Sequence, residues 1–228
     1  MLLSALSSES HNPGARRRWG AIKFTKNALY TSLIDDRAIL DRPDKDTGKL
    51  LQAGAEEVLW IQGPREGIKD TVSMAIDRLS HLDGIIIEGN SAIEFSNPDV
   101  VIFTVGVREE ETKKASALRL IKHADIIVFP KGRMPHDPEK NVYSARVVYF
   151  DPEDGKTGQE LLACMDEVIK EHSLDRIRHS LKEKTVDGRI SCAAARKIAE
   201  ELKVPIGEVG KAADELKIKI RNCELGCF

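Results

Sequence analysis

Six short apolar segments constrain the fold of this chain more than any other feature of its sequence. Each segment is rich in β-branched residues, does not alternate with polar residues and is bounded by polar chain; the segments are residues 19–24, 57–61, 83–88, 99–105, 124–129 and 145–150. Continuous apolar runs of this length are typical of strands that are covered on both faces of a sheet. The sequence therefore predicts six buried strands.

Segments with helical character lie between several of these strands, at residues 46–54, 65–80, 109–122 and 157–171. Alternation of strands and helices is typical of a mostly parallel, doubly wound α/β sheet. We therefore expect one α/β domain over residues 1–172. In such sheets ligands bind beyond the carboxyl ends of the strands, so the residues at those ends are the first candidates for a functional site.

The C-terminal residues follow a different pattern. Ala195, Ile198 and Leu202 are spaced as on one face of a helix, and helical spacing resumes over residues 206–216 after a turn at residues 203–205. The last residues, 217–228, can form a β-hairpin wing. This order predicts a small winged helix-turn-helix domain over residues 173–228, which follows a linker near residues 171–175.

Nucleic acid is a disfavoured partner for this predicted domain, although the sequence does not exclude it. A recognition helix needs basic or polar side chains that reach phosphates and base edges. The second predicted helix carries one base, Lys211, against the acids Glu208, Asp214 and Glu215. The sequence therefore favours a domain that docks on another protein over one that reads DNA.

The composition is that of a globular protein with a substantial core, since 41% of the residues are hydrophobic and 32% are charged. No apolar run approaches the ~18–20 residues of a membrane span, so we expect no membrane partner. Four cysteines in a chain of 228 residues indicate a reducing compartment rather than a disulfide framework. We therefore expect a cytoplasmic protein.

The segment "DRPDKDTGKLLQAGA" places Lys45, Asp46 and Thr47 where the chain enters a predicted helix. Either Asp46 or Thr47 can cap that helix, which is reason enough for their presence. Alternatively, Asp46 or Thr47 reaches the coordination shell of a Mg²⁺ ion, which prefers oxygen ligands and keeps several waters. In that interpretation Lys45 contacts a phosphate group.

Two further candidates stand at the ends of predicted strands. Glu88 ends the strand "DGIIIE" and is followed by Gly89, which leaves room for a ligand to approach. Lys23 lies late in the strand "WGAIKF", where a lysine is unusual unless its amine reaches a cleft or solvent. Because a parallel sheet brings the carboxyl ends of its strands to one edge, we expect Lys23, Asp46 and Glu88 to lie near one another.

Gly155-Lys156-Thr157 resembles the end of a phosphate loop but lacks the rest of that motif. The full pattern requires a glycine five residues before Gly155, where this chain has Phe150. Thr157 and Glu160 have the spacing of a capping box, so we interpret them as the start of a helix.

The cysteines permit a thiol metal site near the C-terminus. Cys223 and Cys227 have a spacing compatible with zinc, and Cys192 can join them if the chain folds back. His179 or Cys164 would have to supply the fourth ligand. Packing of reduced thiols is the interpretation that we favour.

Three segments together resemble a known family. The order "AIKFTK", "DRPDKDTGKLLQAGAEEV", "LDGIIIEGN" is similar to that of molybdopterin-guanine dinucleotide biosynthesis protein B, over residues 1–105. The resemblance implies a P-loop NTPase-like fold that binds GTP with Mg²⁺ and assists guanine dinucleotide addition to the molybdenum cofactor. It maps the nucleotide and metal contacts onto Lys23, Thr25, Lys45, Asp46, Thr47 and Glu88, with Gly89 near the site.

The chain departs from that family at the phosphate loop. The family begins with a strand and a G-x-x-x-x-G-K-[ST] loop, and Met1 of this chain aligns with the helix that follows the loop. We expect the loop to be encoded upstream of Met1, and the chain as it stands to bind GTP poorly and to be a weak GTPase at best. Lys131, in "ADIIVFPKG", can stack on a purine, but no Asn-Lys-x-Asp pattern supports a preference for guanine.

Three functions follow from these patterns. The first is a GTP-binding accessory protein of molybdenum cofactor maturation, which acts with a molybdopterin-transferring partner enzyme and is compatible with a homodimer. The second is a transcriptional regulator or a protein-docking scaffold that uses the C-terminal domain. The third is a scaffolding paralogue that has lost catalysis.

Overall fold

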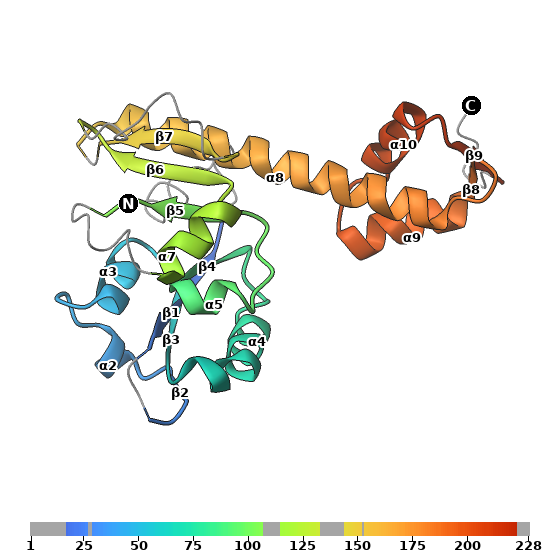
Figure 1. The fold of residues 1–228 in the computed structure, drawn as a ribbon. Coiled ribbons are helices and arrows are strands. Elements are labelled where there is room, and N and C mark those ends of the chain that lie inside the picture. The colour runs from blue at the N-terminus through green and yellow to red at the C-terminus, as the bar shows by residue number, and fades with distance from the viewer. Residues whose placement is uncertain (1–16, 27–28, 107–114, 133–143, 152, 223–228) are drawn as a thin grey trace. The chain divides into compact units, whose positions relative to one another are not determined.

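The computed structural model of the protein describes residues 17–26, 29–106, 115–132, 144–151 and 153–222 (Figure 1). These residues form a mixed α/β fold whose sheets are mostly parallel. The chain divides into two compact units, Met1–Met165 and Asp166–Phe228. Residues 1–16, whose first residue aligns with a helix of the family that the sequence resembles, lie outside the described residues.

The division falls within one long helix, α8 (Gly155–Lys184). The linker that the sequence predicts at residues 171–175 is therefore wrong, because those residues lie inside α8, and the boundary at 172–173 moves to 165–166. Residues 159–184 contain neither glycine nor proline, so nothing in them ends a helix.

The N-terminal unit contains a four-stranded sheet in the order β2-β3-β1-β4. Its strands are β1 (Trp19–Thr25), β2 (Ser32–Ile34), β3 (Glu57–Gln62) and β4 (Gly84–Glu88). The central strand β1 pairs in parallel with β3 and β4, whereas β2 is an antiparallel edge strand. The sequence did not predict β2, because three partly buried residues give no periodic signal.

Helices cover both faces of this sheet. On one face Ile22 and Phe24 of β1 pack against α4 (Ile68–Arg78). On the other face Ala21 packs with residues of α2 (Arg37–Leu40) and α3 (Asp46–Gln52). Because both faces are covered, every position of β1 from Gly20 to Phe24 except Lys23 is buried. This explains the continuous apolar runs in the sequence.

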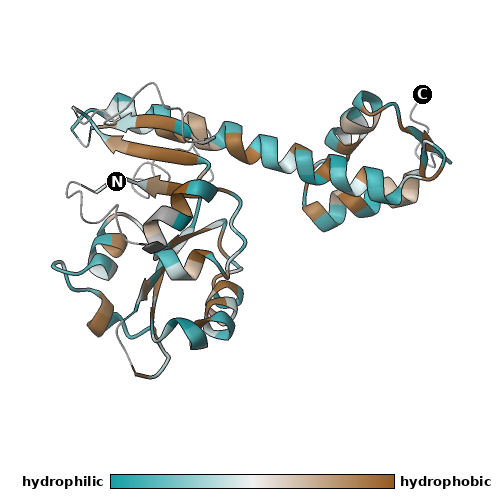
Figure 2. Ribbon diagram, in the orientation of Figure 1, coloured by the Kyte–Doolittle hydropathy of each residue, from teal (hydrophilic) through white to brown (hydrophobic). Residues whose placement is uncertain are grey.

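A second sheet contains β5 (Ile102–Thr104), β6 (Ile126–Pro130) and β7 (Arg146–Phe150), all parallel, with β6 in the centre. The central strand β6 is hydrophobic along its length (Figure 2). The prediction of one sheet is wrong, since the described strands of this unit form two separate sheets. An apolar run identifies a strand, but the neighbour of that strand depends on pairing between distant residues.

The other predicted helices of this unit agree with the structure in part. Residues 65–80 form a 3₁₀ turn, η1 (Arg65–Gly67), followed by α4. The segment 109–122 gives α7 (Ala115–Leu120) and the 3₁₀ turn η2 (Ile121–His123), and its residues 109–114 lie outside the described chain. A short helix that the sequence did not predict, α5 (Asn90–Ile93), follows β4.

The C-terminal unit has its own hydrophobic core. It contains the end of α8, β8 (Arg189–Ser191), α9 (Cys192–Leu202), α10 (Ile206–Glu215) and β9 (Lys219–Arg221). Buried side chains from three helices form this core, among them Ile177, Leu181, Ile198 and Val209. The two predicted helices are confirmed, and Lys203 makes the turn between them in the left-handed conformation with φ 54°.

The residues that the structure describes contain only the start of the predicted wing, so the hairpin stays a prediction. In these residues, strand β9 pairs in parallel with β8. The chain reaches this arrangement because α9 and α10 carry it back to the start of β8, as a parallel crossover requires. Residues 223–228, the other part of the predicted hairpin, lie outside the described chain. Across the described helices, none combines the length and apolarity of a membrane-crossing segment.

Candidate functional site

The carboxyl edge of the four-stranded sheet brings together the three segments that the sequence singles out. In the register of the sheet, Lys23 of β1 lies opposite Glu88 of β4. The Nζ atom of Lys23 is 2.6 Å from Oε1 of Glu88 and 2.7 Å from Oδ2 of Asp46, in the first turn of α3. One ammonium group therefore bridges two carboxylates from different elements.

Burial and neighbouring charges shift the pKa of the Lys23 amine in opposite directions. The side chain of Lys23 is only 16% exposed. Burial lowers the pKa of this amine, but its hydrogen bonds to Asp46 and Glu88 outweigh burial and leave the pKa above its ordinary value. The hydrogen bond from Lys23 also holds the pKa of the Asp46 carboxyl below its ordinary value. Lys23 and Asp46 are therefore both ionised over a wide range of pH.

The start of α3 positions Asp46 for its ion pair with Lys23. Lys45 is the N-cap residue and makes no side-chain capping bond, so the prediction that Asp46 or Thr47 caps the helix is wrong. Asp46 is the first helical residue, where the helix dipole favours a negative charge. Because the carboxylate is not used for capping, it is available to Lys23.

Thr47 has a structural contact. Its hydroxyl donates a hydrogen bond of 2.8 Å to the carbonyl of Leu40, and the residue is 4% exposed. This bond joins α3 to the end of α2 and satisfies the one buried polar side chain among the described core residues.

The donor set fits a hydrated Mg²⁺ only in part. Two carboxylates with free coordination sites suit an ion that keeps several waters. The described residues, however, contain no group of three or more His, Cys, Asp or Glu side chains arranged to hold a metal. A cation at this edge would have Asp46 and Glu88 as its protein ligands and would take the place of the Lys23 amine.

The other residues predicted to contact a nucleotide, Thr25, Lys45 and Lys131, bind partners outside the Lys23 cluster. The Thr25 hydroxyl, at the end of β1, accepts a hydrogen bond of 3.0 Å from the indole N–H of Trp60. Lys45 pairs with Asp44 at 3.3 Å. Lys131 follows β6 and lies 3.2 Å from Asp151, which raises the pKa of its amine. Among the described residues, the ion pairs of Lys45 and Lys131 are with Asp44, Asp151 and Asp154, not with the Lys23 cluster.

Gly89 needs to be glycine. Its φ of 137° is a conformation that other residues rarely adopt. A Cβ atom at this position would also lie 2.8 Å from Cβ of Phe24. The glycine after Glu88 therefore allows β4 to turn into α5 close against β1, which is a structural role at the edge of the site.

The Gly155-Lys156-Thr157 segment starts a helix, as the sequence predicts, but by a different set of bonds. The Asp154 carboxylate accepts a hydrogen bond from the backbone N–H of Lys156 at 3.0 Å. The Thr157 hydroxyl donates to the carbonyls of Asp151 and Asp154. Asp154 therefore caps α8 in place of the predicted Thr157–Glu160 box.

The predicted thiol site is not assembled by the described residues. Cys192 is buried in the first turn of α9, Cys164 is half-buried in α8, and Cys223 and Cys227 lie outside the described chain. His179, the other candidate ligand, lies 3.3 Å from Glu183, one turn away on α8.

Sequence reasoning missed Lys49, a second cation at the site. Its Nζ atom lies 3.6 Å from Oδ1 of Asp46, three residues earlier on α3. The i,i+3 spacing in "DTGK" is a signal that could have identified this pair. Lys49 is 64% exposed, so it marks the solvent side of the cluster, whereas Lys23 forms its base.

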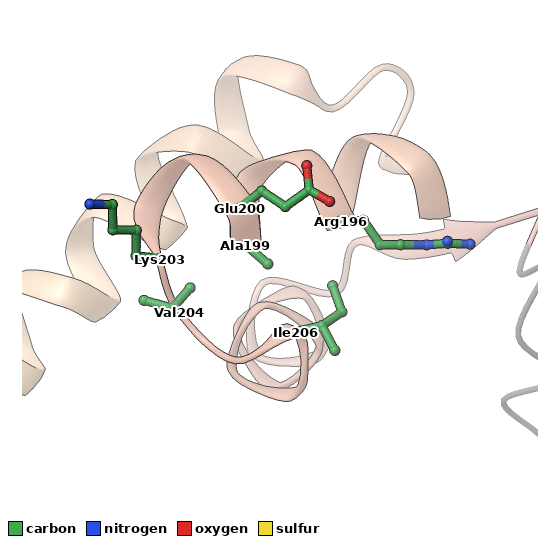
Figure 3. A pocket seen from close by; sticks show the side chains of 6 residues that line it. All are labelled: Arg196, Ala199, Glu200, Lys203, Val204 and Ile206. Carbon is green, nitrogen blue, oxygen red and sulfur yellow. The ribbon is translucent and has the colours of Figure 1, made fainter.

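The C-terminal unit has a shallow hollow of about 310 Å³ where α9 meets α10. Ala199, Val204 and Ile206 supply apolar surface, and Lys203 and Arg196 stand at its two ends (Figure 3). Ile206 at the start of α10 is 44% exposed. Glu200, which lies between Arg196 and Lys203 on α9, also lines the hollow.

Replacing Lys23 with methionine tests the electrostatic description of the cluster. We expect the variant to be about 1 kcal/mol less stable near neutral pH, because two half-exposed carboxylates lose their shared cation. The pKa of Asp46 is lowered by folding, so its contribution is present above its ordinary value of 3.8 and is lost as pH falls below it. The pKa of Lys23 is raised, so its contribution is lost only above 10.5.

Urea denaturation of both proteins between acidic and neutral pH measures this difference. The stability gap should shrink as the pH drops through the range in which Asp46 takes up a proton. Lys49→Met is the matched control, since this lysine is more exposed and more distant from Asp46. A gap that stays constant with pH, or an equal loss in the control, contradicts the description.

Comparison with known proteins gives no relative: the chain matches no protein-family model, no curated protein and no solved structure.

Proposed function

We propose that this protein is a GTP-binding accessory protein of molybdenum cofactor biosynthesis, in which the carboxyl edge of the four-stranded sheet is the metal side of a phosphate site. The observation that carries the proposal is the bridge from Lys23 to Asp46 and Glu88, at 2.7 and 2.6 Å. The three residues come from the three segments that resemble molybdopterin-guanine dinucleotide biosynthesis protein B.

The bridge suggests how the site would work. Without a ligand, the Lys23 amine pairs with both carboxylates and offsets one of their two negative charges. A hydrated Mg²⁺ ion that arrives with a nucleotide would bind Asp46 and Glu88 in its place, since a divalent oxygen-seeking cation competes well for carboxylates. The displaced amine would then be free to contact a phosphate oxygen.

In this proposal the N-terminal unit has a P-loop NTPase-like fold and the C-terminal unit is a variant of the winged helix. Support for the first comes from the parallel order of β3, β1 and β4, with helices on both faces and charged residues at the carboxyl ends. Support for the second comes from the helix-turn-helix of α9 and α10. The C-terminal unit would dock on a molybdopterin-transferring partner enzyme.

Calorimetric titration of the whole chain with Mg²⁺ and GTP tests the proposal. We expect saturable but weak binding, with a Kd of about 0.1 to 1 mM, or about 4 to 5.5 kcal/mol. The binding is weak because no glycine-rich loop in the sequence supplies a cradle of backbone N–H groups. Binding should require Mg²⁺ and should be lost in the double variant Asp46→Asn, Glu88→Gln.

The matched control is Asp44→Asn, which removes an exposed carboxylate from the same loop without touching the bridge. This variant should bind as the wild type does. No saturable heat at millimolar GTP, or binding that is indifferent to Mg²⁺ and to the double variant, would rule out a phosphate site at this edge. Micromolar affinity would contradict the expectation of weak binding.

A second candidate function is that of a protein-docking scaffold. The observation that favours it is the hollow between α9 and α10, with the exposed side chain of Ile206 at its rim. Exposed apolar surface rimmed by charged side chains is typical of interaction sites. Purification of a partner that Ile206→Asp no longer retains, with GTP binding unchanged, would separate this function from the first.

A further inference from the structure

One face of the small sheet in the C-terminal unit is basic. Strands β8 and β9 pair in parallel in a register that sets Arg189 opposite Lys219 and Ser191 opposite Arg221. Because side chains of a strand point alternately to its two faces, these four residues share one face. Ile190 lies between them in sequence and belongs to the opposite face.

The burial of Ile190 agrees with this assignment, whereas Ile220, which lies opposite it in the register, is 38% exposed. Ile190 is 3% exposed and packs in the hydrophobic core of the unit. The four residues of the other face, Arg189, Ser191, Lys219 and Arg221, are all exposed. The sheet therefore packs Ile190 against the core and presents three cations and the serine on its other face to solvent. We call these four residues the basic face.

The charge of the basic face is not neutralised by ion pairs within the described structure. The bonds of the unit between cations and carboxylates involve other residues, such as Arg178 with Glu215 and Lys184 with Glu201. Among the described residues, no ion pair involves Arg189, Lys219 or Arg221. Asp187, in the turn before β8, is the acidic residue nearest to Arg189 in sequence, and it makes no ion pair with that residue.

The chemistry of the basic face favours one kind of partner. Arginine, lysine and serine are side chains that contact phosphate oxygens in nucleic-acid complexes. A surface that binds protein usually has an apolar centre, and none of the four residues of the basic face is apolar. Ser191 is also the N-cap of α9, where its hydroxyl oxygen accepts a hydrogen bond from the backbone N–H of Ala194, and the positive end of that helix adds to the attraction for an anion.

Spacing supports separate phosphate contacts. Alternate residues of a strand lie about 6.6 Å apart, and neighbouring strands about 4.8 Å apart. The three cations can therefore each meet a different phosphate group of an extended chain. We propose that the basic face binds the phosphodiester backbone of nucleic acid without reading its sequence.

This proposal is independent of the proposed function, because it uses no residue of the Lys23 cluster. It also differs from binding through a recognition helix. Helix α10 carries Glu208, Asp214 and Glu215 and stays unsuited to base reading. The contact instead comes from the strands that flank the helix pair.

Fluorescence anisotropy with labelled single-stranded DNA of two unrelated sequences tests the proposal on the whole chain. We expect both oligonucleotides to bind equally. The logarithm of the affinity should fall with the logarithm of salt concentration with a slope of about −2, since three cations each displace about 0.7 counterion from a single strand. The triple variant R189Q/K219Q/R221Q should bind about a hundredfold more weakly at about 0.1 M salt.

The matched control is K170Q/K197Q/K211Q, which removes the same charge from exposed positions elsewhere in the unit. This control should keep most of the affinity and the salt slope, and circular dichroism should show that both variants are folded. Each single variant of the basic face should reduce the slope by about 0.7.

Three results would overturn the proposal. The first is no saturable binding of either oligonucleotide by the wild type. The second is an equal loss of affinity in the two triple variants, which would show attraction to overall charge. The third is binding of polyglutamate as tight as that of DNA, which would indicate an acidic protein partner.

Discussion

Replacing Gly48 with alanine is expected to destabilise the N-terminal unit by about 3 kcal/mol, a larger loss than most single substitutions cause. Gly48 is buried in α3, and a Cβ atom at this position would lie 2.0 Å from the carbonyl oxygen of Arg42 and 2.4 Å from its carbonyl carbon. These are backbone atoms, so no side-chain rotation can relieve the overlap. The segment before α3 would have to move away from the helix.

That movement would also disturb the candidate site. The segment from Arg42 to Lys45 leads directly to Asp46, which lies 2.7 Å from Lys23. We therefore expect Gly48→Ala to lower the thermal midpoint by about 6 to 12 °C and to weaken any binding that depends on Asp46.

Gly158→Ala is the matched control for this prediction. Gly158 lies in α8 within the same unit, and a Cβ built there meets no atom within 4 Å apart from its chain neighbours and the backbone of its own helix. Alanine should stabilise a helix at such a position by about 0.5–1 kcal/mol. Differential scanning calorimetry should show opposite shifts for the two variants. Equal thermal midpoints for the two variants would contradict the close approach of the Arg42 backbone to Gly48.

Replacing Ile198 with alanine is expected to remove about 3 kcal/mol from the stability of the C-terminal unit. Ile198 is fully buried and lies in α9 among side chains of α8 and α10, including Ile177 and Val209. The unit Asp166–Phe228 is small. A domain of this size has only about 3–5 kcal/mol of stability, so the cavity should leave it marginally folded.

Hydrogen exchange of the whole chain measures the effect unit by unit. Amides of α9 and α10 should exchange faster by about two orders of magnitude, since about 1.4 kcal/mol corresponds to a factor of ten. Ile206→Ala is the control, because this isoleucine is 44% exposed and its truncation should have little effect. Protection that is unchanged in Ile198→Ala would show that this residue does not anchor the core.

Much of the secondary structure could be predicted, because its cause is local. The apolar runs around Ile22, Leu59 and Ile126 form strands as expected, and α3, α4, α9 and α10 follow their helical spacing. Short elements such as β2 have too few residues to show a periodic hydrophobic pattern. The linker near residues 171–175 was predicted from a change in pattern, yet those residues form helix because no glycine or proline interrupts it.

The sequence allowed us to predict which residues form the candidate site, but not all of the contacts between them. The lysine in β1, the acid at the start of α3 and the acid that ends β4 stood out by residue type and position. The sequence could not show that the amine of Lys23 would bridge both carboxylates, nor that Thr47 would donate to Leu40. These contacts depend on how α3 packs over the end of β1.

By itself, the sequence determined most of the strands and the longer helices, and which charged residues stand at strand ends, because periodicity and local propensity decide both. Only the tertiary structure decided that the strands divide into two sheets, that β9 pairs in parallel with β8, and that Lys23 meets Asp46 and Glu88. Each of these depends on pairing between residues far apart in the chain. Such pairing is selected by the packing of the whole unit, and no local pattern encodes it.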